Sequence, residues 1–213
     1  MISPSVRLSS PSWRAARAVS LAAFAVVTLA ACGNTRVSRI DPASVTDLSG
    51  KWNDADSRLV ANALITQSID ASWARQYSNS NAGRTPTVIV GPFVNRTLEH
   101  IPVQTFTRDL ERAYVTTGAV RVVASADERS SVRAERDDQQ MNAVAESRAR
   151  LAMEQGAQFM LQGDVQAIED AQGRERVVTY QIDATLVDLE TNAKVWVGQH
   201  KIKKYVDRRR IGW

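Results

Sequence analysis

Cysteine and histidine are scarce in this sequence, which has one cysteine and two histidines among its 213 residues. A single thiol excludes an internal disulfide and a thiol-based metal site. His100 and His200 are far apart, and neither lies in an HExxH frame, so the pattern predicts no metal site. Glycine-rich phosphate loops are also lacking, and we expect no cofactor.

The sequence has no apolar run long enough to span a membrane. Its apolar stretch at residues 18–31 is shorter than the roughly 20 residues that a spanning helix needs. The residues before it contain Arg7, Arg14 and Arg17 and no acidic side chain. A basic leader, a short apolar segment and small residues at its end are typical of an export signal. We therefore predict that residues 1–31 form a signal peptide rather than a core helix.

The only cysteine, Cys32, follows this leader directly. The segment LAAC at 29–32 resembles the bacterial lipobox, in which the thiol is diacylated and the chain is cut just before it. The resemblance implies that Cys32 becomes the mature N-terminus and carries S-diacylglycerol and N-acyl groups. Two or more acyl chains give stable membrane anchoring. In proteobacterial lipoproteins a residue other than aspartate after the cysteine permits export, so Gly33 predicts a lipid anchor in the outer membrane, facing the periplasm.

The overall charge is misleading about the partner. The formal net charge is +4 and the isoelectric point is near 9.5, values that would suit a nucleic-acid-binding protein. Three of the cations lie in the leader, so its removal leaves a nearly neutral chain. Export to the envelope argues independently against nucleic acid, and we expect no nucleic-acid partner.

The rest of the chain is predicted to be one small α/β (α+β) domain at residues 47–207. A short polar tether at 32–46 precedes it and a basic tail at 208–213 follows it. The expected element order α-β-α-β-α-β-β-β predicts a mixed sheet packed by helices. We expect this domain to be monomeric.

Three helices are expected. The first begins at the N-cap Asn53 and continues toward Trp73. The second covers residues 102–116 and stops at Gly118. A Ser-x-x-Glu capping box at Ser125 opens the third, whose apolar pattern fades at 133–140 and returns as far as Met153.

Five strands are expected from short β-branched runs and from alternation of apolar and polar residues. In the fourth strand the odd and even positions separate cleanly into a polar and an apolar face. The turns between the last three strands are predicted at 170–173 and 188–192. The strands lie at residues 87–90, 120–124, 159–165, 178–186 and 195–205.

Four stretches resemble the LpoB family, lipoprotein activators of class A penicillin-binding proteins. They are DLSGKWNDADSRLVANALI at 47–65, VGPFVNRTLEHIP at 90–102, GAQFMLQGDV at 156–165 and ATLVDLETNAKVW at 184–196. The resemblance covers about residues 45–205, and KWND at 51–54 and NRT at 95–97 are its most specific parts.

The resemblance implies a fold similar to the N-terminal domain of TolB and no catalysis. It also implies that the protein binds a bifunctional peptidoglycan synthase from the outer-membrane side and stimulates it. Enterobacterial LpoB carries a long, disordered, proline-rich tether, whereas the tether here is short. This difference motivates an alternative, an envelope assembly or scaffold lipoprotein that binds other outer-membrane or periplasmic proteins.

The loop that carries one of these motifs follows a strand and precedes a helix, where binding surfaces are common in α/β proteins. Its candidate partner-binding residues are Asn95, Arg96, Thr97, Glu99 and His100. Two interpretations are open: Asn95 satisfies backbone groups while Arg96 and Glu99 form a solvated ion pair, or the loop contacts a partner. No nucleophile accompanies His100 as a catalytic base.

Basic residues accumulate near the C-terminus, with Asp207 as the only acid among them. Lys201 and Lys203 share a strand face, which fits a charged sheet edge that resists aggregation. The alternative is an electrostatic contact with anionic lipid headgroups or an acidic partner patch. The cluster comprises Lys201, Lys203, Lys204, Arg208, Arg209 and Arg210.

Paired carboxylates that could cleave glycan strands are the remaining enzymatic option. Asp164, Asp183 and Asp188 are the candidates. Alternation along strands already requires polar residues there, and turns explain the rest. We therefore expect a protein that is not an enzyme.

Overall fold

The computed structural model describes residues 37–150 and 153–207. The chain divides into two units, Met1–Pro42 and Ala43–Trp213, and every helix and strand below belongs to the second. Cys32, the predicted leader and the arginines at 208–210 lie outside the described residues. Within the described ranges, no helix is both long enough and apolar enough to cross a membrane.

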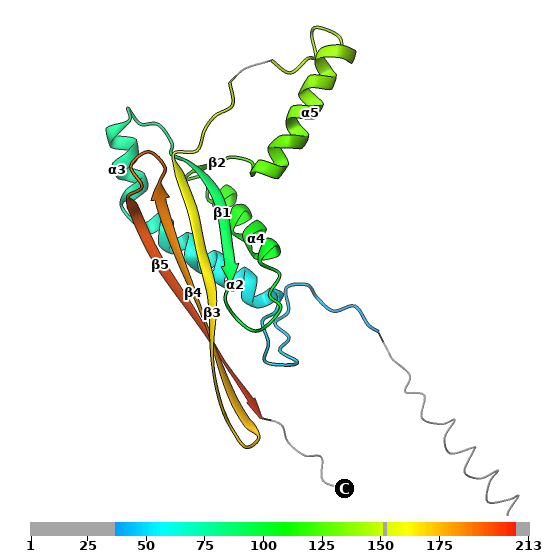
Figure 1. Cartoon of the computed structure of the whole chain (residues 1–213), viewed down its shortest axis with the longest axis vertical. Helices are drawn as coiled ribbons and strands as arrows, with labels where there is room; N and C mark the ends of the chain where they lie inside the picture. The colour runs from blue at the N-terminus through cyan, green and yellow to red at the C-terminus, as the bar shows by residue number, and fades with distance from the viewer. Residues whose placement is uncertain (1–36, 151–152, 208–213) are drawn as a thin grey trace, which may run out of the picture. The chain divides into compact units, whose positions relative to one another are not determined.

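A five-stranded mixed sheet forms the centre of the domain (Figure 1). Its strand order is β2-β1-β3-β4-β5. β1 runs parallel to both β2 and β3, whereas β4 is antiparallel to both β3 and β5. The predicted α+β fold with a mixed sheet is thus confirmed. The strands are β1 (Thr87–Asn95), β2 (Arg121–Val122), β3 (Phe159–Gln172), β4 (Glu175–Asp188) and β5 (Lys194–Asp207).

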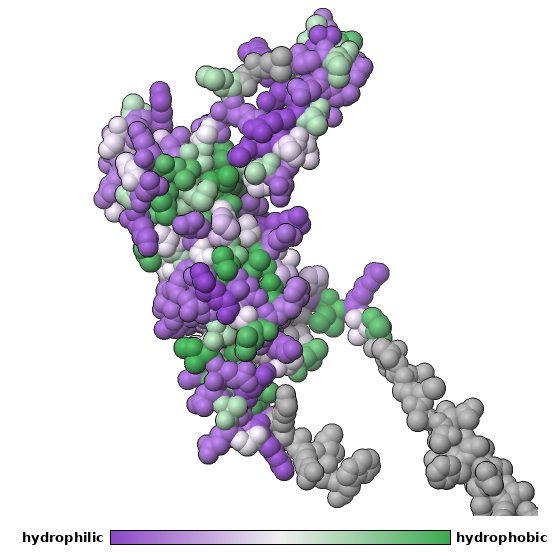
Figure 2. Space-filling view, in the orientation of Figure 1, coloured by the Kyte–Doolittle hydropathy of each residue, from purple (hydrophilic) through white to green (hydrophobic). Residues whose placement is uncertain are grey.

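Two helices pack on one face of this sheet. α2 (Asp54–Asp70) contacts α4 (Val103–Thr117) and β5, and α4 also contacts β1 and β2. The short helix α3 (Trp73–Ser80) follows α2. The helix α5 (Ala126–Asn142) has no buried residue, and Figure 2 shows it covered mostly by hydrophilic side chains.

The capping box expected at Ser125 is present, and the predicted N-cap Asn53 is also part of a capping box. The side chain of Asn53 accepts from the amide of Asp56 at 3.1 Å, and the carboxylate of Asp56 accepts from the amide of Asn53 at 2.8 Å. Ser125 and Glu128 make the same reciprocal pair at the start of α5. These bonds satisfy amides that a helix start otherwise leaves unpaired.

Two predicted helix ends were wrong. The apolar stripe from Asn53 does not continue through to Trp73, because α2 ends at Asp70 and the Trp73 indole donates to the carbonyl of Ser68 at 2.7 Å. The third helix ends at Asn142 rather than near Met153. Its sequence offers no apolar face to pack on the sheet, so nothing prolongs it.

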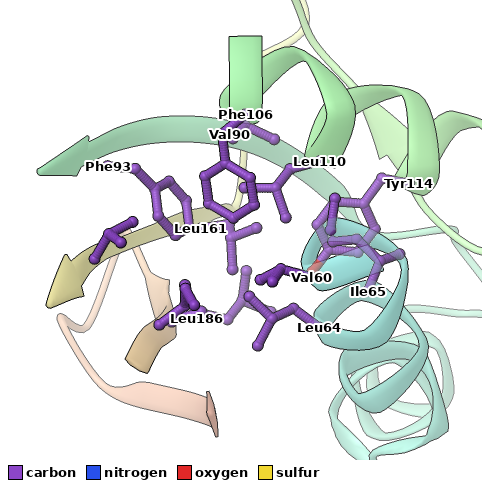
Figure 3. Packing of buried hydrophobic residues seen from close by; sticks show 14 of the residues in the cluster. Val60, Leu64, Ile65, Val90, Phe93, Phe106, Leu110, Tyr114, Leu161 and Leu186 are labelled. Carbon is purple, nitrogen blue, oxygen red and sulfur yellow. The ribbon is translucent and has the colours of Figure 1, made fainter. Parts of the chain in front are cut away.

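The core lies between the helices and the inner face of the sheet (Figure 3). The predicted alternation along β4 is confirmed, since its inward side chains are at most 1% exposed. Each fully buried large apolar side chain stabilises the fold by about 1.5–3 kcal/mol. The inward residues of β4 are Val178, Tyr180, Ile182, Ala184 and Leu186.

Candidate functional site

Two segments that are far apart in the sequence meet at one hydrogen-bonded junction. The first is the anchor segment, residues 47–53, and the second is the loop at residues 95–100. One carboxylate oxygen of Glu99 accepts from the amide of Trp52 at 3.3 Å, and the other accepts from the Tyr180 hydroxyl at 2.8 Å. Because Tyr180 is a fully buried residue of β4, the junction fixes both segments to the sheet.

Asn95 and Thr97 hold loop 95–100 together from within. The side-chain nitrogen of Asn95 donates to the backbone carbonyl of Glu99 at 2.7 Å. The side-chain oxygen of Asn95 accepts from the backbone amide of Thr97 at 2.9 Å. The Thr97 hydroxyl in turn accepts from the amide of Glu99 at 3.1 Å. These local bonds support the structural interpretation for Asn95 and Thr97.

The remaining side chains of loop 95–100, apart from Glu99, point outward. Arg96, Leu98 and His100 are exposed, and the relative accessibility of Leu98 is 108%. The ion pair suggested for Arg96 and Glu99 is wrong, because Glu99 bonds to Trp52 and Tyr180 instead. Arg96 Nε lies 3.5 Å from a carboxylate oxygen of Asp164. The loop therefore presents one leucine between a permanent cation and a histidine.

An ion-pair cluster centred on the buried Lys204 fixes the other end of the anchor segment. Lys204 Nζ donates to Asp47 and Asp56 carboxylates, both at 2.6 Å, and to the carbonyl of Lys51 at 3.0 Å. Burial lowers the pKa of Lys204, but the bonds to Asp47 and Asp56 outweigh it and leave the pKa above its usual value. Lys204 is only 7% exposed. It therefore cannot belong to the exposed basic cluster predicted from the sequence, which is a correction.

The anchor segment also packs closely on the strands beneath it. The Trp52 ring lies edge-on to Tyr180, with centroids 5.5 Å apart, and to Phe106 at 6.0 Å. Gly50 has φ +68°, and a Cβ there would clash with the Val206 side chain, so only glycine fits. Burial raises the pKa of Tyr180, as does the adjacent Glu99. Tyr180 thus stays a neutral donor to the carboxylate.

The other cations of the predicted basic cluster separate into two groups. Lys201 and Lys203 are exposed on the outer face of the edge strand β5, opposite Gln181 and Thr179. That position fits the protected sheet edge and also leaves both side chains free for an electrostatic contact. The cluster's arginines at 208–210 lie outside the described residues, so the two interpretations stay open.

Only two of the three candidate glycosidase carboxylates lie close together. Asp164 and Asp183 are opposite each other on the outer face, whereas Asp188 lies at the far end of β4. Asp183 accepts from two glutamine amides, and Asp164 accepts from one and forms an ion pair with Arg96. Within the described part of the chain, no three metal-binding side chains gather.

Sequence reasoning missed Leu98 as the most exposed member of the loop and Tyr180 as its support. The signal for Leu98 was present, because it is an apolar residue in the middle of a polar loop. The Tyr180–Glu99 bond spans 81 positions in the sequence and left no local signal.

Comparisons with known proteins bear on this site only through the family. Among curated protein sequences none matches this chain. Solved structures with a similar arrangement include the LpoB C-terminal domain from Salmonella enterica, with 16% identity, a TM-score of 0.38 and coverage of 70% of this chain and 99% of that one. The solution structure of Escherichia coli LpoB has 14% identity, a TM-score of 0.40 and 83% coverage of each chain. Lipoprotein GNA1162 from Neisseria meningitidis has 15% identity, a TM-score of 0.37 and coverage of 59% and 88%.

The family model described as peptidoglycan-synthase activator LpoB matches residues 56–202. This span contains loop 95–100, the whole sheet up to Ile202 and most of α2. The match covers more than half of the chain, so the family assignment rests on it and not on the solved structures, whose similarity is low. The chain belongs to the LpoB family of peptidoglycan-synthase activators, which regulate synthases rather than act as enzymes.

Proposed function

We propose that this protein is an outer-membrane lipoprotein that binds and stimulates a class A penicillin-binding protein through loop 95–100. The observation that carries the proposal is the rigid loop that holds Leu98 fully exposed between Arg96 and His100. Contacts preformed in this way lose little conformational freedom when a partner binds. Side chains that fill a well-packed, desolvated pocket near the centre of an interface contribute most of the binding free energy, and Leu98 and Arg96 are the residues of this loop placed to do so.

Stimulation without catalysis requires a difference in binding. The protein raises the activity of a synthase only if it binds the active conformation more tightly than the inactive one. A tenfold difference in affinity corresponds to about 1.4 kcal/mol. Loop 95–100 needs no acid, base or nucleophile for this role, which agrees with a family of regulators.

The predicted lipid anchor limits where the partner can be met. Fully stretched, residues 33–46 reach at most roughly 50 Å. The tether ends at that point, because Asp47 is bonded to Lys204 of the domain. The synthase must therefore extend its own periplasmic part toward the outer membrane.

The test combines the chain from residue 33 onward with the class A synthases of the same organism. This chain retains all buried core residues, which lie between Ala55 and Leu186. Polymerisation of lipid-linked precursor should rise for the wild type and fall back for Leu98→Ala. Leu189→Ala, which removes an exposed leucine from the β4–β5 turn, is the matched control and should stimulate normally. If the wild type neither binds nor stimulates any synthase, the proposal is wrong.

A scaffold lipoprotein is the second candidate, and the short tether favours it. Crosslinking in intact cells from a photoreactive residue at position 98 distinguishes the two functions. Adducts with a synthase support the activator. Adducts with outer-membrane proteins alone support the scaffold.

A further inference from the structure

The sheet has a second feature that loop 95–100 does not use, a groove beside its β2 edge. The groove has a volume of about 390 Å³ and lies between α4, the end of β2 and the first turn of α5. Val115 on its wall is 62% exposed, although it is a large apolar residue. The lining residues are Glu111, Val115, Val122, Val123, Ala124 and Glu128.

The backbone of β2 can accept another strand at this groove. The amides of Arg121 and Val123 donate to carbonyls of Pro86 and Val88 on the β1 side, both at about 3 Å. Alternation along a strand turns the amide and carbonyl of Val122 to the opposite side, away from β1. β2 ends the strand order, so that side faces the groove rather than another strand of this sheet. An extended segment is the natural occupant of such an edge.

The charges of the groove select a basic occupant. Burial raises the pKa of Glu111, and the negative charge of Glu128 raises it further. Bonds from Ser125 lower the pKa of Glu128, which therefore stays ionised. Arg108 offsets part of this repulsion, and the lining of the groove itself contains two carboxylates and no cation. A cation between the two carboxylates would relieve the repulsion.

We propose that this groove binds the basic C-terminal segment Arg208–Trp213 of a second copy of the chain. That segment reads RRRIGW, with three cations for the glutamates and two apolar residues for the valine wall. One interpretation of the basic cluster in the sequence is contact with an acidic partner patch. The proposal places that acidic patch on a second copy of the same protein. The proposal is independent of the synthase and replaces the expected monomer with an assembly.

The segment cannot reach the groove of its own chain. β2 is level with Phe159 at the start of β3, whereas Asp207 is level with Gln172 at its end. β3 has 14 residues, so these levels are about 43 Å apart at about 3.3 Å per residue. The segment 208–213 spans at most about 20 Å. Its occupancy of the groove therefore requires another molecule.

Such a contact joins different surfaces of the two copies. The contact is heterologous, and repetition of it closes into a ring or continues as a filament. Anchoring in one membrane would favour it by raising the local concentration.

The test measures the molecular mass of the chain from residue 33 by sedimentation at increasing concentration. The wild type should assemble, and deletion of residues 208–213 should give a monomer. Glu111→Gln combined with Glu128→Gln should weaken assembly by about tenfold or more. Glutamine keeps the capping box at Ser125, so α5 is preserved. The matched control Glu146→Gln, at an exposed position after α5, should assemble like the wild type.

A labelled peptide of sequence RRRIGW identifies the occupant. It should bind the tailless chain and lose about tenfold in affinity for the tailless Glu111→Gln, Glu128→Gln protein. Equal peptide binding to both proteins, or a wild type that stays monomeric while the peptide binds only vesicles of anionic phospholipid, would overturn the proposal. The second result would assign the tail to the membrane surface.

Discussion

Glu99 accepts a hydrogen bond from the hydroxyl of Tyr180 at 2.8 Å, and its other carboxylate oxygen accepts from the amide of Trp52 at 3.3 Å. One side chain thus connects loop 95–100, the anchor segment and the centre of the sheet. The predicted partner-binding residues therefore have different roles. Asn95, Thr97 and Glu99 shape the loop, whereas its exposed residues are available to a partner.

The first prediction follows from that bond. Glu99→Ala leaves the Trp52 amide without its partner, and it leaves the Tyr180 hydroxyl with only a long bond to the Gly50 carbonyl at 3.4 Å. An unsatisfied buried donor costs about 1–3 kcal/mol, so the free energy of unfolding should fall by about that amount. Urea unfolding measures it. The control Glu146→Ala removes an exposed glutamate and should be near neutral, and equal stability of the two variants would contradict a structural role for Glu99.

Arg96 should behave in the opposite way. Its ion pair with Asp164 is long and the arginine is 60% exposed, and exposed pairs contribute only about 0–1 kcal/mol. Arg96→Glu should therefore leave the melting temperature almost unchanged. Affinity for the synthase should fall by more than the stability does, because an unmatched charge within an interface can cost about 2–5 kcal/mol. Calorimetric binding and thermal unfolding of the same variant check this pair of outcomes.

The architecture could be predicted from the sequence where the signal is local. The β4 alternation, the N-cap at Asn53, the capping box at Ser125 and the glycine stop at Gly118 all depend on neighbouring residues. The site could not be assembled this way, because Lys204 meets Asp56 across 148 positions and Tyr180 meets Glu99 across 81. A lysine in a run of cations reads as exposed, and only tertiary packing buries it.

That burial gives the third prediction. Lys204→Met leaves the nearly buried carboxylate of Asp56 without its cation, whereas the half-exposed carboxylate of Asp47 stays hydrated. Removal of one partner from a buried ion pair costs about 3–5 kcal/mol. Lys203→Met, one residue away and exposed, is the matched control and should change stability little. Chemical unfolding of both proteins decides, and a small effect at Lys204 would mean that water enters the cluster freely.

The fourth prediction concerns alkaline pH. Burial raises the pKa of Tyr114 from 10.0 to about 12, and a 2.7 Å hydrogen bond joins its hydroxyl to Ser68. The folded state therefore holds this proton more tightly than the unfolded state does. Its contribution is complete below pH 10 and is lost as the pH rises toward 12, so stability should fall in that window.

Tyr114→Phe separates this group from Lys204 and Tyr180, whose pKa values are also raised. The variant should be less stable at neutral pH by about 0.5–1.5 kcal/mol, the net contribution of one hydrogen bond. Above pH 10 the free energy of unfolding of the variant should decline less steeply with pH than that of the wild type. The difference between the two slopes should correspond to about one bound proton. Urea unfolding at several pH values measures the slope, and equal slopes for variant and wild type would contradict the assignment.

The last prediction tests the lipid anchor. The buried core begins at Ala55, well after Cys32, so Cys32→Ala should leave the domain folded. It removes the thiol that the acyl group needs, and the protein should keep its leader or be cut elsewhere. Mass spectrometry of the mature chain and membrane fractionation measure both effects. Asn34→Ala should be processed normally, whereas Gly33→Asp should stay lipidated and fail to reach the outer membrane. A Cys32→Ala protein that matures to the same N-terminus and fractionates like the wild type would show that the lipidation prediction is wrong.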